Sequence, residues 1–382
     1  MVLGGDVAQQ IKKIRVAIIA LIFVSYFIIA ARPIPNEIVL VPAWLSSLLA
    51  DSSFESSASG YTHGQLIPFI LGSRFGYVDL SGNFVINKVK TGDVFLSENL
   101  WTEFDAEPER IEIKNTGEET VLSVENPGGY PFFLDNRIFI LGSEQNALSE
   151  VGADGEILWT YEFGAPLTCI DAAAGLVLTG SIDGVIEILD SQGRRIFYFE
   201  PGGSNYAVIL GCAISSNGSR VGIISGIEQQ RFLFLERFGE SGEYKVVYHE
   251  FLDAGFRRPV LVSFIDDDSR LVYERQGGID CYNIKSRRMM RIPLEGEIAA
   301  IDNSGEGGFF FLINSRSSRQ KELIGIKFPQ ENSISFFNFT RERDAIFIRA
   351  AFKSDSVFLS RTGSRLVAGG GTTLISFNIE EH

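Results

Sequence analysis

Residues 153–199 read ADGEILWTYEFGAPLTCIDAAAGLVLTGSIDGVIEILDSQGRRIFYF, and the pattern of this stretch decides the fold. Short runs of Val, Ile, Leu, Phe and Tyr alternate with polar residues and are separated by small clusters of Gly, Asp and Ser. Alternation with a period of two is typical of half-buried strands, and such clusters mark turns. The stretch therefore predicts a succession of short antiparallel strands.

The turn chemistry of this stretch recurs along the chain. A Gly-Ser pair between two apolar runs occurs at 72–73, 142–143 and 180–181, separated by 70 and 38 residues, which is close to two periods and one. A second signature, in which a Ser-Arg pair opens an apolar strand, places three arginines at equivalent positions: Arg220, Arg270 and Arg365. A fixed period of this length indicates repeated supersecondary units.

Polar turns give an independent count of the repeats. They lie near Gly82, Gly117, Gly155, Gly193, Gly242, Ser286 and Gln330, in steps of roughly 35 to 49 residues, which fit one four-stranded sheet per repeat. One such sheet cannot bury both of its faces, whereas sheets stacked in a closed ring can. We predict an all-β propeller of four-stranded blades, with eight blades favoured and seven the alternative, starting near residues 66, 94, 131, 167, 207, 259, 298 and 355.

The two ends of the predicted ring are incomplete. The first unit lacks its innermost strand, and the last unit stops after three strands, at Ile379. A ring of this kind closes when a strand from one terminus completes a blade built by the other. Residues 37–41 (EIVLV) are the candidate for the missing outer strand of the last blade, and the alternative is a plain linker.

Composition supports a globular domain and excludes one class of partner. Of the 382 residues, 45% are hydrophobic and 21% are charged, which is enough for a large core. The 31 Phe and 11 Tyr favour strands. The net charge of −14 argues against nucleic acid as a partner, because phosphate binding needs a concentrated basic surface.

An uncharged apolar run precedes the repeats. Residues 16–31 read VAIIALIFVSYFIIAA, with Lys12, Lys13 and Arg15 before the run and Arg32 after it. This pattern predicts a signal-anchor helix over residues 14–32 that leaves 1–13 in the cytoplasm and carries the rest across the membrane. A cleaved signal peptide is the alternative. Both interpretations place the propeller outside the cytoplasm, at the periplasmic side or the cell surface.

Between the anchor and the propeller (65–382) lies a Ser-rich tether, residues 33–64. Trp44, Leu45, Leu48 and Leu49 have helical spacing, so a short helix is expected here, either in the membrane interface or packed on the propeller. The small and polar residues that follow suit a flexible linker.

The chain has three cysteines, Cys169, Cys212 and Cys281, each in an apolar, strand-like run. We expect buried free thiols at all three positions. The alternative is a Cys169–Cys212 bridge between neighbouring repeats, which requires Cα atoms within about 7 Å.

The stretch quoted above resembles the PQQ-type β-propeller repeat of the quinoprotein dehydrogenase superfamily. The resemblance lies in Asp154-Gly155 with Trp159 four residues later, Gly184 opening a strand that ends at Leu189-Asp190, and Gly193. Later units look more like WD40 repeats in their Ser-Arg-Leu turns. The resemblance implies the fold. It also implies a kinship with non-enzymatic propeller lipoproteins that assist outer-membrane β-barrel assembly, although this chain has no lipid-attachment cysteine.

The enzymes of that superfamily hold their cofactor with a tryptophan floor, adjacent cysteines and a calcium site. This chain has no adjacent cysteines and only three tryptophans. His63, His249 and His382 are too scattered for a metal site or a His-based triad. The run Asp266-Asp267-Asp268 is interpreted as a turn rather than a cation site. We therefore expect no enzyme activity, no cofactor and no metal.

The remaining candidate for function is one rim of the ring. Loops that join successive blades share a rim with loops that join the two middle strands of a blade. Aromatic and Arg side chains on loops are frequent anchors of protein interfaces. The predicted partner-binding rim contains Arg74, Phe75, Tyr130, Tyr206, Phe256, Arg257, Arg258, Arg316 and Arg319.

Three functional hypotheses follow. The first is a membrane-anchored scaffold that binds protein partners in the envelope, and it predicts no titratable cluster in the central channel. The second is a propeller enzyme or ligand sensor, which predicts acidic or basic groups with shifted pKa values converging on the channel mouth. The third is a purely structural domain of a larger envelope machine.

Overall fold

The computed structural model describes residues 15, 18–21, 23, 37–49, 66–239, 242–253, 255–302, 307–328 and 345–382. These residues form two compact units, one spanning 41–378 and a small one in which residues up to Leu40 meet 379–382. From residue 37 onward, every regular element described is a strand apart from a single 3-10 residue. The all-β prediction is confirmed.

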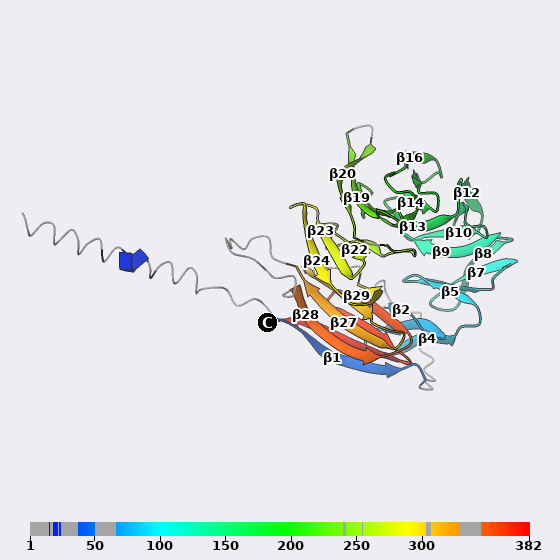
Figure 1. The fold of residues 1–382 in the computed structure, drawn as a ribbon. Helices are drawn as coiled ribbons and strands as arrows, with labels where there is room; N and C mark the ends of the chain where they lie inside the picture. Colours follow the sequence, from blue (N-terminus) through cyan, green and yellow to red (C-terminus); the bar gives the residue numbers. More distant parts are fainter. Residues whose placement is uncertain are drawn as a thin grey trace, which may run out of the picture. The chain divides into compact units, whose positions relative to one another are not determined.

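Eight sheets, referred to below as blades one to eight, follow one another along the chain (Figure 1). Blade one contains β2 (Leu66–Leu71), β3 (Arg74–Asp79) and β4 (Phe84–Val89). Blade two contains β5 (Asp93–Leu96), β6 (Leu100–Phe104), β7 (Arg110–Asn115) and β8 (Thr120–Glu125). Blade three contains β9 (Gly129–Leu134), β10 (Arg137–Gly142), β11 (Ala147–Val151) and β12 (Ile157–Glu162). Blade four contains β13 (Leu167–Ala173), β14 (Leu176–Ser181), β15 (Ile186–Leu189) and β16 (Arg195–Phe199).

The second half repeats the arrangement. Blade five contains β17 (Ile209–Ile214), β18 (Arg220–Ser225), β19 (Arg231–Phe238) and β20 (Glu243–Phe251). Blade six contains β21 (Val262–Ile265), β22 (Arg270–Arg275), β23 (Gly278–Asn283) and β24 (Arg288–Pro293). Blade seven contains β25 (Glu297–Ile301), β26 (Phe309–Ser315), β27 (Gln320–Lys327) and β28 (Ile346–Lys353). Blade eight contains β29 (Val357–Thr362), β30 (Arg365–Gly370), β31 (Thr373–Glu381) and β1 (Ile38–Ser47).

The sheets form a closed ring. Within each sheet, strands that are consecutive in sequence pair antiparallel, and the first strand of one blade contacts the first strand of the next, as for β9 with β13 and β17 with β21. Shared apolar clusters join blade one to two and blade six to seven. Because β29 also contacts β2, the ring closes on itself after eight blades. The predicted count of eight, with units starting close to the predicted positions, is confirmed.

Ring closure uses the N-terminal segment. β1 lies beside β31 as the outermost strand of blade eight, so the predicted closing strand is present and extends further than residues 37–41. In the small unit, Glu37 and His382 exchange two backbone hydrogen bonds of 3.0 Å. The expected short helix around Trp44 is wrong, because residues up to Ser47 continue the strand and pairing with β31 satisfies their backbone.

Blade one has three strands among the described residues, and they match the second to fourth strands of other blades. In blade four, Gly193 of the last turn lies against Trp159 of the preceding blade's outer strand, where an added Cβ would be 2.5 Å from the indole. Gly82 lies against Trp44 of β1 in the same way, at 2.7 Å. The turn at Gly82 is therefore the last turn of its blade. Residues 50–65, directly before β2, lie outside the described residues, so the predicted absence of an innermost strand stays a prediction.

The core lies between neighbouring blades. Among the described residues, each apolar cluster combines side chains of two successive blades, for example Phe139 and Leu148 of blade three with Val177 and Leu189 of blade four, all fully buried. No blade can bury both faces alone, so each depends on its neighbours for stability. The same dependence explains why strands between two blades, such as β17 and β23, are buried at every position.

Two cysteines are joined across a blade interface. Cys169 in β13 and Cys212 in β17 form a disulfide with a Cα–Cα distance of 6.1 Å. The expectation of three free thiols is therefore wrong for this pair, because stacking brings the innermost strands of blades four and five within bridging distance. Cys281 is free and buried, as expected, and burial raises the pKa of its thiol to about 12.

The predicted anchor at 14–32 lies almost entirely outside the described residues. Within it, Arg15, Ile18–Leu21 and Phe23 are helical. The described part of the chain contains no helix that is both long and apolar enough to span a bilayer. His63 and most of the tether also lie outside the described residues.

Candidate protein-binding face and channel hollow

The loops of the predicted rim do lie together. In blade five the middle loop, residues 226–230, binds the two neighbouring inter-blade loops: the Gly226 N–H donates to the Val208 carbonyl and the Leu252 N–H to the Gln230 carbonyl, both at 2.8 Å. In blade seven the Ser354 N–H donates to the Arg319 carbonyl at 2.9 Å. These bonds place the middle loops and the inter-blade loops on one face, which is called the loop face below.

Several predicted rim residues serve the fold instead. Phe75 is completely buried between blades one and two, where its ring centroid lies 5.4 Å from that of Trp101, so it is not available to a partner. Phe256 is half-buried in the cluster between blades five and six, under the Arg258 guanidinium at 4.7 Å. The apolar character of β3, in which residues 75–79 are all buried, was the signal that Phe75 belongs to the core.

Arg258 is committed to a buried carboxylate. Its guanidinium donates to both oxygens of Glu274, at 2.7 and 3.0 Å, and Glu274 is only 3% exposed. Glu297 lies 3.6 Å away on the other side. The bidentate contact with Glu274 raises the pKa of Arg258. Removing Arg258 would leave a buried charge without its partner, so this residue is structural.

Other predicted rim arginines form surface pairs. Arg319 bonds Asp355 at 3.0 Å, and both side chains are mostly exposed. Arg316 lies 3.1 Å from Glu322, and Arg74 donates to the Asn87 side chain at 3.2 Å. The exposed Arg319–Asp355 pair contributes little to stability and remains accessible. Glu322 is buried, so Arg316 neutralises a buried carboxylate. Tyr130, half-buried, packs beside Phe104.

One part of the loop face is apolar and exposed. Tyr206 is 58% exposed, and Arg257 is also exposed. The rim prediction missed two further exposed residues at the loops of this face: Ile182, 52% exposed, and Phe251, 55% exposed. These four residues of blades four and five and the loops beside them form the loop-face patch. The sequence did not reveal Ile182 and Phe251, because apolar residues of these types are usually buried. They are exposed here because of their position at the end of a strand.

A second candidate site is a hollow lined by the innermost strands of blades four to six. Its volume is about 500 Å³, and its lining includes the carboxylates of Asp135, Asp171 and Asp268. Asp171 accepts backbone hydrogen bonds from Ile214 at 2.8 Å and Ala172 at 2.9 Å. Burial outweighs these bonds and raises the pKa of Asp171 to about 6.

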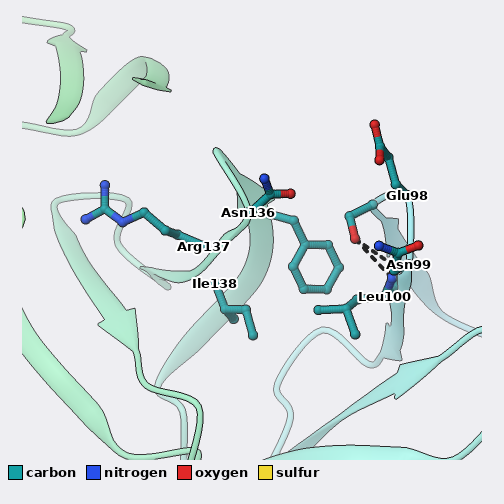
Figure 2. Close-up of a pocket in the computed structure, with 8 residues that line it drawn as sticks. Glu98, Asn99, Leu100, Asn136, Arg137 and Ile138 are labelled. Atoms are coloured by element: carbon teal, nitrogen blue, oxygen red, sulfur yellow. Dashed lines mark hydrogen bonds between the residues drawn. The ribbon is translucent and has the colours of Figure 1, made fainter. Parts of the chain in front are cut away.

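A further hollow of about 450 Å³ lies between blades two and three (Figure 2). Leu100, Phe133 and Ile138 form its apolar part, and Glu98, Asn99 and Asn136 surround it. Arg137 also lines it, but Figure 2 shows its side chain pointing away. That guanidinium instead bonds Glu150 at 2.8 Å. The hollow offers an apolar slot with polar edges and no catalytic arrangement.

The run of three aspartates is a turn, as predicted. Asp266, Asp267 and Asp268 have φ angles of 57°, 49° and 58°, in the left-handed region that Asp tolerates. The Ser269 N–H donates to the Asp266 carbonyl at 2.9 Å, and Asp268 accepts from the Ser216 N–H at 2.7 Å. The carboxylate of Asp266 also accepts from the Ser269 hydroxyl at 2.8 Å, so the carboxylates of Asp266 and Asp268 stabilise loops.

The closed ring, the strand that joins both ends of the chain and the blade-to-blade core define an eight-bladed β-propeller. The chain belongs to the family of β-propeller proteins, whose model matches residues 7–382. A relative in Treponema pallidum (strain Nichols), described as an uncharacterized protein, is 24% identical over 316 residues, which covers 81% of this chain and 83% of the relative.

Two solved structures share the fold. BamB from Moraxella catarrhalis aligns with a TM-score of 0.57 over 89% of this chain and all of that chain, at 12% identity. The computationally designed Ika8 protein aligns with a TM-score of 0.59 over 84% of this chain and 94% of that chain, also at 12% identity. At this level of identity the similarity shows the architecture alone.

Proposed function

We propose that this protein is a membrane-anchored, extracytoplasmic scaffold that binds protein partners in the envelope through its loop face. The observation that carries the proposal is the loop-face patch, in which Ile182, Tyr206 and Phe251 are each more than half exposed and Arg257 is exposed in a loop of the same face. Exposed aromatic and aliphatic side chains with an Arg at their edge are typical of interface anchors.

The membrane and envelope parts of the proposal rest on the sequence. The apolar run at 16–31 with Lys12, Lys13 and Arg15 before it favours an anchor over 14–32 with a cytoplasmic N-terminus. The disulfide between Cys169 and Cys212 agrees with an oxidising compartment. The resemblance to propellers that assist outer-membrane assembly adds a role in membrane-protein assembly to the proposal. The topology can be tested by fusing to the C-terminus a reporter that is active only in the cytoplasm. Activity of this fusion would contradict the proposed topology.

The channel hollow favours a second candidate function. Three aspartates line it, and the pKa of Asp171 is raised to about 6, which is the feature that a ligand sensor would show. Against this candidate, Asp135, Asp171 and Asp268 each accept hydrogen bonds from backbone groups and thereby stabilise neighbouring turns. We therefore rank the binding scaffold first and expect the protein to have no catalytic activity.

The decisive experiment compares partner recovery by matched variants. The full-length protein is purified from detergent-solubilised membranes, and co-purifying proteins are identified by mass spectrometry. Tyr206→Ala with Arg257→Glu disrupts the loop-face patch without touching the core, whereas changing Phe256 or Arg258 would also disturb folding. Arg287→Glu, an exposed charge inversion in the turn between β23 and β24, serves as the control.

The proposal expects the double variant to lose a partner that the wild type and the Arg287→Glu protein both retain. Equal recovery by all three proteins would contradict a binding role for the loop face. Thermal unfolding of each variant shows whether the fold is intact, since exposed residues of this kind change stability by less than about 0.5 kcal/mol.

A further inference from the structure

β1 has its C-terminal end, and not its N-terminal end, at the loop face. In blade eight the middle loop joins β30 to β31 and contains Thr372. The Leu48 N–H, directly after the end of β1, donates to the Thr372 carbonyl at 2.8 Å. β1 is a single strand of ten residues, and such a strand is about 30 Å long. The chain therefore enters blade eight from the end that is opposite to the loop face.

The segment that leads from the predicted anchor to β1 is short. The uncharged apolar run ends at Ala31, and Arg32 follows it. At the other end, Glu37 is fixed to His382 by two backbone hydrogen bonds of 3.0 Å, so it already belongs to the strand pair. Only residues 33–36, Pro-Ile-Pro-Asn, join these two parts of the chain. Four residues reach at most about 14 Å, whatever conformation they adopt.

These two lengths decide which face of the propeller can approach the bilayer. A loop face turned toward the membrane would hold the start of β1 about 30 Å above the surface, because the strand ends at that face. The four linker residues cover only about half of this distance. The loop face therefore cannot lie on the membrane while the predicted anchor spans it.

The position of the loop-face patch around the ring adds to this separation. β1 is the outermost strand of blade eight, whereas the patch belongs to blades four and five and the loops beside them. In a closed ring of eight blades that follow one another in chain order, blade four lies opposite blade eight. A propeller tilted onto the edge of blade eight would therefore also hold the patch far from the bilayer.

We propose that the short linker holds the start of β1 at the bilayer surface and that the propeller presents the loop-face patch away from the membrane. The partner of the patch is then a protein domain or loop in the aqueous phase, and not the membrane-embedded part of a protein. The composition of the patch suits this partner, because Tyr206 and Arg257 are residue types that are enriched in protein interfaces.

This inference rests on the proposed function, from which it takes the anchor and the loop-face patch. It adds the orientation of the propeller and the class of partner that can reach the patch. The two ideas can fail separately, since partner recovery by Tyr206→Ala with Arg257→Glu tests the patch whereas the distance of each face from the lipid tests the orientation.

Labelling of introduced cysteines can measure this distance, because the native thiols are protected. Cys169 and Cys212 are paired and Cys281 is buried, so a maleimide dye attaches to a single introduced cysteine. Glu381→Cys places the dye at the end of β31, the strand that pairs with β1. Glu228→Cys places it in the middle loop of blade five, on the loop face but outside the patch. Both positions are exposed.

The experiment uses the full-length protein in phosphatidylcholine vesicles, prepared with and without lipids that carry a nitroxide on the headgroup. A nitroxide quenches only dyes that lie close to it, and nitroxides in both leaflets make the direction of insertion unimportant. The proposal expects at least twofold quenching of the dye at position 381 and no quenching of the dye at position 228.

A lengthened linker is the matched control. A Gly-Ser insert of about 20 residues between Asn36 and Glu37 has an end-to-end distance of about 25 Å and lets the propeller move away from the surface. We expect the insert to reduce the quenching at position 381 by at least half. Quenching that the insert leaves unchanged would overturn the proposal, because the propeller would then be held at the lipid by its own surface.

Two other results would overturn the proposal. One is quenching at position 228 that equals or exceeds the quenching at position 381, and the other is no quenching at either position in protein that floats with the vesicles. Loss of a partner by Tyr206→Ala with Arg257→Glu, together with equal quenching at both positions, would support the proposed function and reject this inference. Equal partner recovery together with quenching confined to position 381 would reject the patch and retain the orientation.

Discussion

Replacing Trp44 by Ala tests whether the N-terminal strand locks the ring. Trp44 lies in β1, and its half-buried indole lies against Gly82 of blade one, where an added Cβ would be 2.7 Å away. The indole N–H donates to the Leu80 carbonyl oxygen at 3.0 Å. The side chain thus joins the last blade to the first, which is where the ring closes.

The magnitude follows from these contacts. Loss of a fully buried Trp costs about 3–5 kcal/mol, so a half-buried one should cost about 2 kcal/mol. The lost hydrogen bond adds less than about 1 kcal/mol, because Arg365 also donates to the Leu80 carbonyl and keeps it from being left unsatisfied. We expect Trp44→Ala to lower the free energy of unfolding by about 2–3 kcal/mol, and Trp44→Phe by about 1 kcal/mol.

The assay is chemical unfolding followed by tryptophan fluorescence and far-UV circular dichroism, with the midpoint and slope fitted for each protein. Leu45→Ala is the matched control, because Leu45 is the next residue of the same strand and is 68% exposed, so its loss should change stability by less than about 0.5 kcal/mol. Equal destabilisation by Trp44→Ala and Leu45→Ala would refute the reasoning that docking of the indole stabilises ring closure.

Three further predictions concern blades three to five. Replacing Cys169 and Cys212 together by Ala should lower stability by up to about 4 kcal/mol, because the bridge links residues 43 apart, and unfolding in denaturant without reductant measures the loss. Burial raises the pKa of Asp171 from 3.8 to about 6, so between these pH values the folded state holds a proton that the unfolded state has released. The free energy of unfolding should therefore fall by up to about 3 kcal/mol as the pH rises from 4 to 6. Asp171→Asn should remove most of that slope in unfolding curves taken across this pH range, and an unchanged slope would assign it to another group. Gly193→Val should lower the free energy of unfolding by more than about 2 kcal/mol, because φ at this position is +71° and the new side chain would collide with Trp159. A thermal midpoint equal to that of the wild type would disprove this contact.

The candidate site was less predictable than the fold. The sequence placed the correct loops on one face, and it identified Tyr206 and Arg257 there. It could not separate them from Phe75 and Arg258, because an aromatic ring or a guanidinium looks the same in a sequence whether it binds a partner or a buried neighbour. Contact with Trp101 and Glu274 decides the roles of these two, and both contacts join residues that lie on different strands or loops.

The sequence by itself determined the propeller and its eight blades, through the period of its Gly-Ser turns, its apolar alternation and the closing strand near residues 37–41. It could do so because each blade is a local antiparallel unit, and the residues that form its turns lie within the blade's own segment of sequence. Tertiary structure alone decided that Cys169 meets Cys212 and that Trp44 continues a strand instead of starting a helix. These features depend on how neighbouring blades stack, and stacking distances are set by packing across the ring rather than by local sequence.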